Sequence, residues 1–174
     1  MTKIRHIVAM TLDGYVAGPN GEADWILMDP DINFAELWAQ FDTFLMGRKT
    51  YEAAIARLGN SSLQGRKTVV VSRTLRPADH PNLTILSDPT RDHLQSLRQQ
   101  STKDIWLFGG GELFRSMLAM HEVDTVEVSL MPVLLGGGIP LLPPLAQRTT
   151  LKLSGHKIYR SGIVSLIYDV QTPL

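Results

Sequence analysis

The sequence predicts a three-layer α/β domain with a central, mostly parallel sheet, antiparallel strands at the C-terminal end, and helices flanking the sheet. The first observation is that short apolar runs alternate with segments of helical spacing through the first two thirds of the chain. Such alternation is typical of a parallel sheet that helices cover on both faces. The second is that no helix-length segment separates the last strands, so these are expected to pair antiparallel.

Size and composition fit one domain over residues 1–174, with 44% hydrophobic and 20% charged residues. Seventeen basic side chains balance 17 acidic ones, which disfavours nucleic acid or a membrane surface as a partner. The chain has no cysteine, and its five histidines show no metal-ligand spacing, so no metal site is expected. No apolar stretch is long enough to cross a membrane. We therefore expect a cytoplasmic protein.

Four apolar runs in the first half are predicted strands, at residues 4–10, 43–46, 67–72 and 83–86. Residues 31–41 are predicted to be helical because large apolar side chains recur on one side, namely Phe34, Leu37, Trp38 and Phe41. A second helix is expected to open at Gly47. A third is expected over residues 89–100, with Pro89 in its first turn.

The second half begins with a predicted strand over residues 104–108, three glycines, and a helix over residues 112–120. Residues 124–131 alternate as a strand does, and residues 151–170 offer two more strands. The glycines at 136–138 precede Ile139-Pro140 and no helix, so a hairpin loop is expected there.

The glycine turn at Gly109-Gly110-Gly111 is the first candidate functional feature. A strand that turns through glycines into a helix presents unpaired backbone N–H groups, which together with the helix dipole suit a phosphate. The alternative is a tight turn that binds nothing. The G-x-G-x-x-G dinucleotide motif is absent, because Phe114 stands where its last glycine belongs.

Two other predicted strand ends carry groups suited to phosphate. The segment Gly47-Arg48-Lys49-Thr50 places two cations and a hydroxyl at a helix start, where cations oppose the helix dipole and therefore suggest a nearby anion. Ser72-Arg73 places a hydroxyl and a guanidinium at the carboxyl end of a strand, where ligands of α/β sheets bind. Three such ends in one sheet favour a dinucleotide laid across them.

Other conspicuous residues have ordinary structural explanations. Asp13 follows the first strand, and aspartate in such a place is more often a turn former than a catalyst. The three tryptophans are most simply core or pocket-wall aromatics, namely Trp25, Trp38 and Trp106.

Four segments resemble motifs of the dihydrofolate reductase superfamily, and particularly of its riboflavin-biosynthesis reductase branch. They are TLDGYVAG at 11–18, FLMGRKTYE at 44–52, VVVSR at 69–73 and IWLFGGGEL at 105–113. Their order and spacing extend the resemblance over nearly the whole chain, and it is to stand-alone, single-domain members. The resemblance implies a dihydrofolate reductase-like fold, NADPH as hydride donor, a small pteridine- or pyrimidine-type substrate, and a homodimer.

The resemblance also implies the residues of the site. Cofactor contacts would come from the strand ends, at Ala9, Gly47, Arg48, Lys49, Thr50, Ser72, Arg73, Phe108, Gly109, Gly110, Gly111, Glu112 and Leu113. The substrate side would be lined by Asp13, Trp25 and Phe108. The candidates for handling the proton are Asp13, Asp31 and Glu36. Counting back from Gly47 without gaps reaches Asp31, and Glu36 lies one turn further on.

Two positions depart from the riboflavin branch, which usually has a lysine where this chain has Tyr15 and a glutamate where it has Phe108. The leading hypothesis is an NADPH-dependent reductase of a small heteroaromatic ring. The alternatives are the riboflavin-pathway 5-amino-6-(5-phosphoribosylamino)uracil reductase, a dihydrofolate reductase, and a non-catalytic NADP(H)-binding protein.

Overall fold

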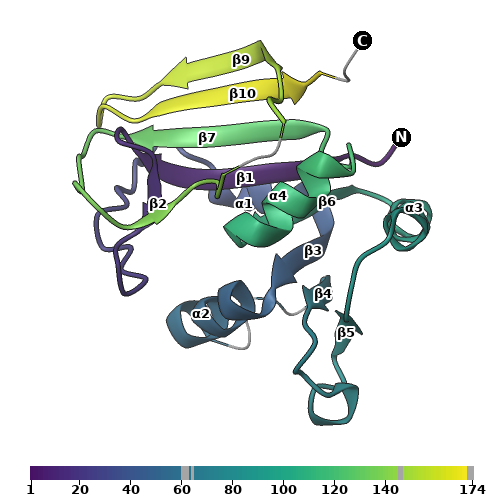
Figure 1. The fold of residues 1–174 in the computed structure, drawn as a ribbon. Helices are drawn as coiled ribbons and strands as arrows, with labels where there is room; N and C mark the ends of the chain where they lie inside the picture. The colour runs from purple at the N-terminus through teal and green to yellow at the C-terminus, as the bar shows by residue number, and fades with distance from the viewer. Residues whose placement is uncertain (60–62, 64, 145–146, 172–174) are drawn as a thin grey trace.

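The computed structural model describes residues 1–59, 63, 65–144 and 147–171. Its main sheet contains β1 (Ile4–Thr11), β3 (Phe41–Gly47), β4 (Lys67–Val71), β5 (Leu83–Leu86), β6 (Asp104–Gly109), β7 (Thr125–Met131), β9 (Leu151–Ile158) and β10 (Val164–Val170). These eight strands lie in the order β5-β4-β3-β6-β1-β7-β10-β9 (Figure 1). Neighbours from β5 to β7 are parallel, whereas β10 is antiparallel to both β7 and β9. The predicted mostly parallel sheet with antiparallel C-terminal strands is confirmed.

Helices pack on both faces of the sheet. Helices α1 (Phe34–Ala39) and α2 (Arg48–Leu58) lie over a core rich in aromatic residues, and α3 (Arg91–Gln100) and α4 (Gly111–Ala119) lie over an aliphatic core on the other face. Alternation along β3 serves both cores, because Phe44 and Met46 join the first and Leu45 joins the second. Burial on both faces explains why the strands are continuous apolar runs in the sequence. No helix in the described ranges has the length and apolar character needed to cross a membrane.

The predicted starts of two helices are wrong by a few residues. Helix α1 begins at Phe34 and not at residue 31, because the Asn33 side chain caps it by accepting a hydrogen bond from the Glu36 N–H (3.0 Å). Helix α3 begins after the capping residue Thr90, so Pro89 precedes the helix. In both cases a side-chain cap determines the boundary.

A small second sheet was not predicted from the sequence. It pairs β2 (Tyr15–Ala17) with β8 (Ile139–Pro140), and so joins the segment after β1 to the segment after β7. Strands of two or three residues are too short to show a period-2 pattern.

Strands β1 and β6 separate before their carboxyl ends, and we call this divergence the β1–β6 fork. Their pairing ends at His6 and Leu107, although β1 continues along β7 to Thr11. Two side chains bond to carbonyls at the fork. The Trp106 indole N–H donates to the Ile7 carbonyl (3.1 Å), and His6 Nδ1 lies 2.9 Å from the Leu107 carbonyl oxygen. The fork thus separates the residues of β1 after His6 from the end of β6.

Candidate cofactor and substrate site

The segments predicted to bind phosphate all lie at one edge of the sheet. Strands β4, β3, β6 and β1 are neighbours and parallel, so their carboxyl ends share that edge. Ser72 follows β4, Gly47 and Gly109 end β3 and β6, and Asp13 lies just beyond β1. Ligands of α/β sheets bind at the carboxyl edge. This edge is therefore the candidate site.

The start of α2 and the glycine turn form one unit. The Thr50 hydroxyl accepts a hydrogen bond from the Gly110 N–H (3.0 Å). The two backbones also come close, since a Cβ on Gly47 would lie 3.9 Å from the Gly109 carbonyl oxygen. Two helix N-termini thus lie together where β3 and β6 end.

Two positions of the glycine turn require glycine for different reasons. Gly109 has φ +121°, a conformation that other residues rarely adopt. A Cβ on Gly111 would lie 2.8 Å from Pro143 Cδ. The Phe114 N–H donates to the Gly110 carbonyl (2.9 Å), and the N–H groups before it have no acceptor within the helix. Such groups can bind an anion.

The cations at this edge differ in their partners. Arg48 forms an ion pair with Glu52, one turn along α2 (Nη1–Oε1 2.8 Å). Lys49 and Arg73 are exposed, and the described part of the chain offers neither side chain a partner. These two cations are available to an anionic ligand.

Ser72 is buried and shapes the turn that follows β4. Its Oγ accepts hydrogen bonds from the N–H groups of Thr74 (3.1 Å) and Leu75 (3.0 Å). The hydroxyl oxygen is thus used by the protein, and Arg73 is the exposed group of this pair.

Asp13 receives hydrogen bonds on both carboxylate oxygens. Oδ1 accepts from the Thr11 hydroxyl (2.6 Å) and the Leu135 N–H (3.2 Å), and Oδ2 accepts from the Gly136 N–H (2.7 Å). The Thr11 hydroxyl, helped by these backbone N–H groups, holds the pKa of Asp13 below its usual value. Asp13 is therefore a carboxylate bound to the segment after β7.

Asp31 and Glu36 differ in their partners. Asp31 precedes α1 and is exposed, and its carboxylate has no partner within the described ranges, whereas its carbonyl accepts from Lys157 Nζ (3.3 Å). The Glu36 carboxylate accepts from Asn33 Nδ2 (3.3 Å). The contact with Lys157 places the Asp31 segment beside the β9–β10 hairpin, which begins its pairing with β7 at Val164 and Leu130, near the carboxyl end of β7.

Asp29 is a buried carboxylate that the sequence analysis missed. Its oxygens accept from the N–H groups of Asp31 (2.9 Å) and Ser161 (3.1 Å), and the Ser161 hydroxyl is the main reason that its pKa is lowered. Asp29 thereby fixes the segment that carries Asp31 to the β9–β10 hairpin. The signal available in the sequence was the Asp29-Pro30 pair, which is typical of a turn.

Phe108 belongs to the aromatic core beneath α1. Its ring centroid lies 4.6 Å from that of Trp106, 5.4 Å from Phe44 and 6.3 Å from Trp38. Phe108 is half-buried and directly precedes the glycine turn, so this core reaches the site. Ala9 is on the opposite side of the fork, in β1.

Trp25, predicted for the substrate side, lies in the segment between β2 and α1. Its indole N–H donates to the Glu22 carbonyl (3.2 Å), and the described ring contacts do not join it to Phe108. The structure therefore places Trp25 apart from the aromatic core.

His6 is a second residue that the sequence analysis did not select. It is 3% exposed, stacks on Phe114 at 3.9 Å between centroids, and approaches Gly109, whose Cβ would lie 3.8 Å from His6 Cε1. Burial lowers the pKa of His6 to about 4, against a weaker opposing effect of its Leu107 hydrogen bond. The sequence shows His6 only as one of two adjacent polar residues, with Arg5, at the start of an otherwise apolar run.

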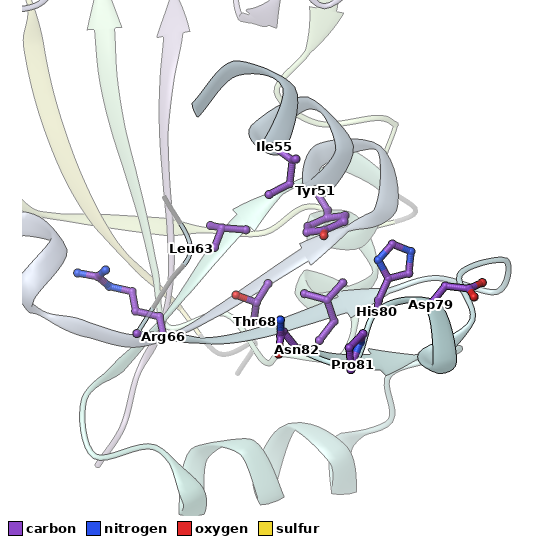
Figure 2. Close-up of a pocket in the computed structure, with 11 residues that line it drawn as sticks. Tyr51, Ile55, Leu63, Arg66, Thr68, Asp79, His80, Pro81 and Asn82 are labelled. Carbon is purple, nitrogen blue, oxygen red and sulfur yellow. The ribbon is translucent and has the colours of Figure 1, made fainter. Parts of the chain in front are cut away.

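A cavity of about 530 Å³ lies away from the glycine turn, between α2, β4 and the segment that leads into β5 (Figure 2). Figure 2 shows Tyr51 of α2 facing His80, whose ring is 6.1 Å away between centroids. The 3-10 turn η2 (Pro77–Asp79) adds Asp79. None of the predicted site residues lines this cavity.

Comparisons with known proteins give a consistent assignment. The model of the RibD C-terminal domain matches residues 2–165. The chain is 34% identical over 172 residues to the uncharacterized protein YyaP of Bacillus subtilis strain 168, covering 92% of this chain and 91% of that protein. It is 27% identical over 159 residues to YwjB of the same strain, covering 90% and 91%.

Solved structures share the fold at low sequence identity. A putative riboflavin biosynthesis protein from Shewanella sp. PV-4 matches with TM-score 0.85 and 20% identity, over 98% of this chain and 100% of that one. A deaminase/5-amino-6-(5-phosphoribosylamino)uracil reductase from Thermotoga maritima matches with TM-score 0.73 and 16% identity, over 98% and 57%. A dihydrofolate reductase from Enterococcus faecalis, complexed with NADP(H), matches with TM-score 0.66 and 15% identity. The match covers 98% of this chain and 97% of that one.

The fold is a three-layer α/β domain similar to that of dihydrofolate reductase. The chain belongs to the RibD C-terminal domain family, because the family model covers most of it. The family resemblance expected from the four motifs is confirmed.

Proposed function

We propose that this protein is an NADPH-dependent reductase that transfers a hydride to a small, planar heteroaromatic ring. The observation that carries the proposal is the carboxyl edge, where the β1–β6 fork is flanked by the Thr50–Gly110 hydrogen bond that joins the N-termini of α2 and α4. A fork next to two anion-binding helix ends suits a flat ring joined to phosphates.

The groups at this edge fit NADPH. The N–H groups that open α4, together with Lys49, suit its diphosphate, and Arg48 can add to them at the cost of its pair with Glu52. Arg73 has no partner among the described residues and suits the additional phosphate that distinguishes NADPH from NADH. When bound, NADPH supplies the hydride. The protein's contribution is to position the two rings.

A proton must also reach the reduced ring, and we propose Asp31 as the residue that handles it, directly or through a water. Its carboxylate is exposed and without a partner in the described part of the chain, and Asp29 fixes its position. Asp13 is less suited, because both of its oxygens already accept hydrogen bonds. Glu36 lies further along α1 and contacts Asn33.

The substrate side favours a flat ring without a sugar phosphate, such as a dihydropterin. Phe108 extends the aromatic core to the fork and offers no hydrogen-bond acceptor. The phosphorylated intermediate of the riboflavin pathway has hydroxyl and N–H groups, each of which costs about 1–3 kcal/mol if left unpaired against an aromatic wall. This disfavours the riboflavin-pathway alternative for this chain.

The test is NADPH oxidation by the purified protein with dihydropterin, dihydrofolate or the ribosylaminopyrimidine phosphate. We expect the loss of reduced-nicotinamide absorbance to be fastest with a pterin. Asp31→Asn should reduce kcat by about 100-fold or more at neutral pH, as for loss of a proton-handling group. The control is Asp92→Asn, which removes an exposed carboxylate in α3. Tight NADPH binding without turnover of any of these rings would instead favour the non-catalytic alternative.

A further inference from the structure

Residues 132–143, which we call the strap, follow β7 in the chain and pass back to the start of α4. Figure 1 shows this segment leaving β7, passing β2 and returning toward α4. Its beginning is held by the Leu12 N–H, which donates to the Val133 carbonyl (3.0 Å). The strap includes β8, whose pairing with β2 keeps it beside the segment after β1.

The far end of the strap lies against the glycine turn. The Leu141 N–H donates to the Gly14 carbonyl (3.0 Å), and Leu141 and Leu142 pack on the aliphatic core. Pro143 is so close to Gly111 that a Cβ there would be 2.8 Å from Pro143 Cδ. The strap therefore extends from the end of β1 to the first residue of α4, along the edge that carries the candidate site.

Asp13 is the side chain that holds the middle of the strap. It is the acceptor for two consecutive backbone N–H groups, those of Leu135 (3.2 Å) and Gly136 (2.7 Å). The Thr11 hydroxyl orients the carboxylate from the other side (2.6 Å), and that hydroxyl oxygen accepts from the Tyr15 N–H (3.0 Å). Thr11 is fully buried, so this arrangement is anchored in the sheet.

We propose that Asp13 is a positioning residue whose carboxylate fixes the strap at the carboxyl edge, where the strap forms one wall of the cofactor cleft. The consequence for the cofactor rests on the proposed function, whereas the attachment of the strap to Asp13 does not. An attached strap keeps Pro143 against Gly111, and so holds the glycine turn in the geometry that presents its N–H groups.

This role differs from that of a proton donor. A protonated carboxyl would place its hydrogen toward the Thr11 hydroxyl or toward one of two backbone N–H groups, all of which donate to Asp13. The lowered pKa of Asp13 agrees with this preference for the charged form. Asp13 therefore serves the site through the strap and not by donating a proton.

The first experiment measures amide hydrogen exchange by NMR in the ligand-free protein, its Asp13→Asn and Asp13→Ala variants, and the Asp92→Asn control. We expect the Gly136 amide to exchange roughly tenfold faster or more in both Asp13 variants, as expected for the loss of a charge-assisted hydrogen bond. Amides of β3 report global unfolding and should be unchanged. Unchanged exchange at Gly136 in both variants would overturn the proposal.

Wild-type protein provides a readout that does not depend on variants that fold. When pH is lowered, the carboxyl carbon of Asp13 and the amide of Gly136 should shift together, with one midpoint below the usual pKa of aspartate. Separate midpoints would overturn the attachment.

The second experiment measures the affinity for NADPH by fluorescence titration of the same proteins. We expect Asp13→Asn to weaken NADPH by roughly tenfold and to lower kcat with an accepted ring by a smaller factor, with the same midpoint in the pH profile of kcat. A kcat loss of about 100-fold with unchanged NADPH affinity would show a proton-handling Asp13 and overturn the proposal. If wild-type protein fails to bind NADPH, the proposed function fails, and the exchange data still decide whether Asp13 holds the strap.

Discussion

At the scale of single residues, burial of His6 makes folding depend on pH. The pKa of the buried imidazole is lowered to about 4, whereas a histidine in the unfolded chain titrates near 6.5. Between these values the unfolded state binds a proton that the folded state does not. The free energy of unfolding should therefore fall by about 3 kcal/mol as pH drops from about 6.5 to about 4, from this group alone. Below about pH 4 both states bind the proton, and His6 causes no further loss.

Urea denaturation between about pH 7 and pH 4 checks this prediction. The variant His6→Gln should remove most of the slope, although it is less stable at neutral pH because His6 contacts Leu107 and Phe114. The matched control is His156→Gln, which changes an exposed residue of β9 and should keep the wild-type slope. An equal dependence of stability on pH in all three proteins would contradict the role of buried His6.

Phe108 should determine which ring the protein accepts. The variant Phe108→Glu adds an acceptor beside the glycine turn, and we expect it to shift the ratio of kcat/KM by about tenfold or more from dihydropterin toward the ribosylaminopyrimidine phosphate. Phe108→Leu removes the ring without adding an acceptor and serves as the control. If wild-type protein already turns over the riboflavin intermediate efficiently, Phe108 does not exclude it.

At the scale of elements, the contact between the strap and α4 should make two substitutions, one on each side, non-additive in the free energy of unfolding. A Cβ on Gly111 would meet Pro143, so Gly111→Ala should destabilise the protein by about 1–3 kcal/mol. Pro143→Ala removes the obstructing ring, and the double variant should recover part of this loss. The control is Gly110→Ala, whose Cβ would meet only Thr50 Oγ1, at 3.4 Å. Strictly additive effects of Gly111→Ala and Pro143→Ala on the free energy of unfolding would contradict the contact.

The strands and longer helices could be predicted because their signals are local. β3 and β6 are apolar runs, and the glycines after β6 mark a turn wherever they occur. The path of the strap could not be predicted, because it depends on contacts between Asp13 and Gly136 and between Gly111 and Pro143, which are far apart in the sequence. The start of α1 depends on a cap by Asn33 that the apolar spacing does not reveal.

In the candidate site, too, residues with a local signal could be predicted and tertiary contacts could not. Arg48, Lys49, Arg73 and the glycines were selected because charge and glycine content at strand ends are visible in a sequence. The bonds that occupy Ser72 and Asp13 depend on tertiary structure, and they change what these residues can do. His6 was missed because neither its burial nor its place at the fork has a local pattern.

At the scale of the whole molecule, β9 leaves apolar side chains exposed at the end of the main sheet. Leu151, Leu153 and Ile158 are 40%, 49% and 72% exposed. We expect a homodimer that covers this strand, with a mass twice that of the chain by light scattering. Leu153→Lys should weaken the dimer, whereas Ala53→Lys on α2 should leave it intact. A wild-type monomer at concentrations well above those of the assays would contradict this expectation.

The central claim is that the carboxyl edge binds NADPH through Arg73 and the glycine turn, and calorimetric titration tests it most directly. NADPH and NADH are titrated separately into wild-type protein, Arg73→Ser, and the control Arg91→Ser at the start of α3. We predict that wild-type protein and the control bind NADPH about tenfold or more tightly than NADH, and that Arg73→Ser loses most of this preference, as expected for loss of a charge-assisted bond of about 1.5–3 kcal/mol. Equal affinity of wild-type protein for the two nucleotides, or an unchanged preference in Arg73→Ser, would contradict the account.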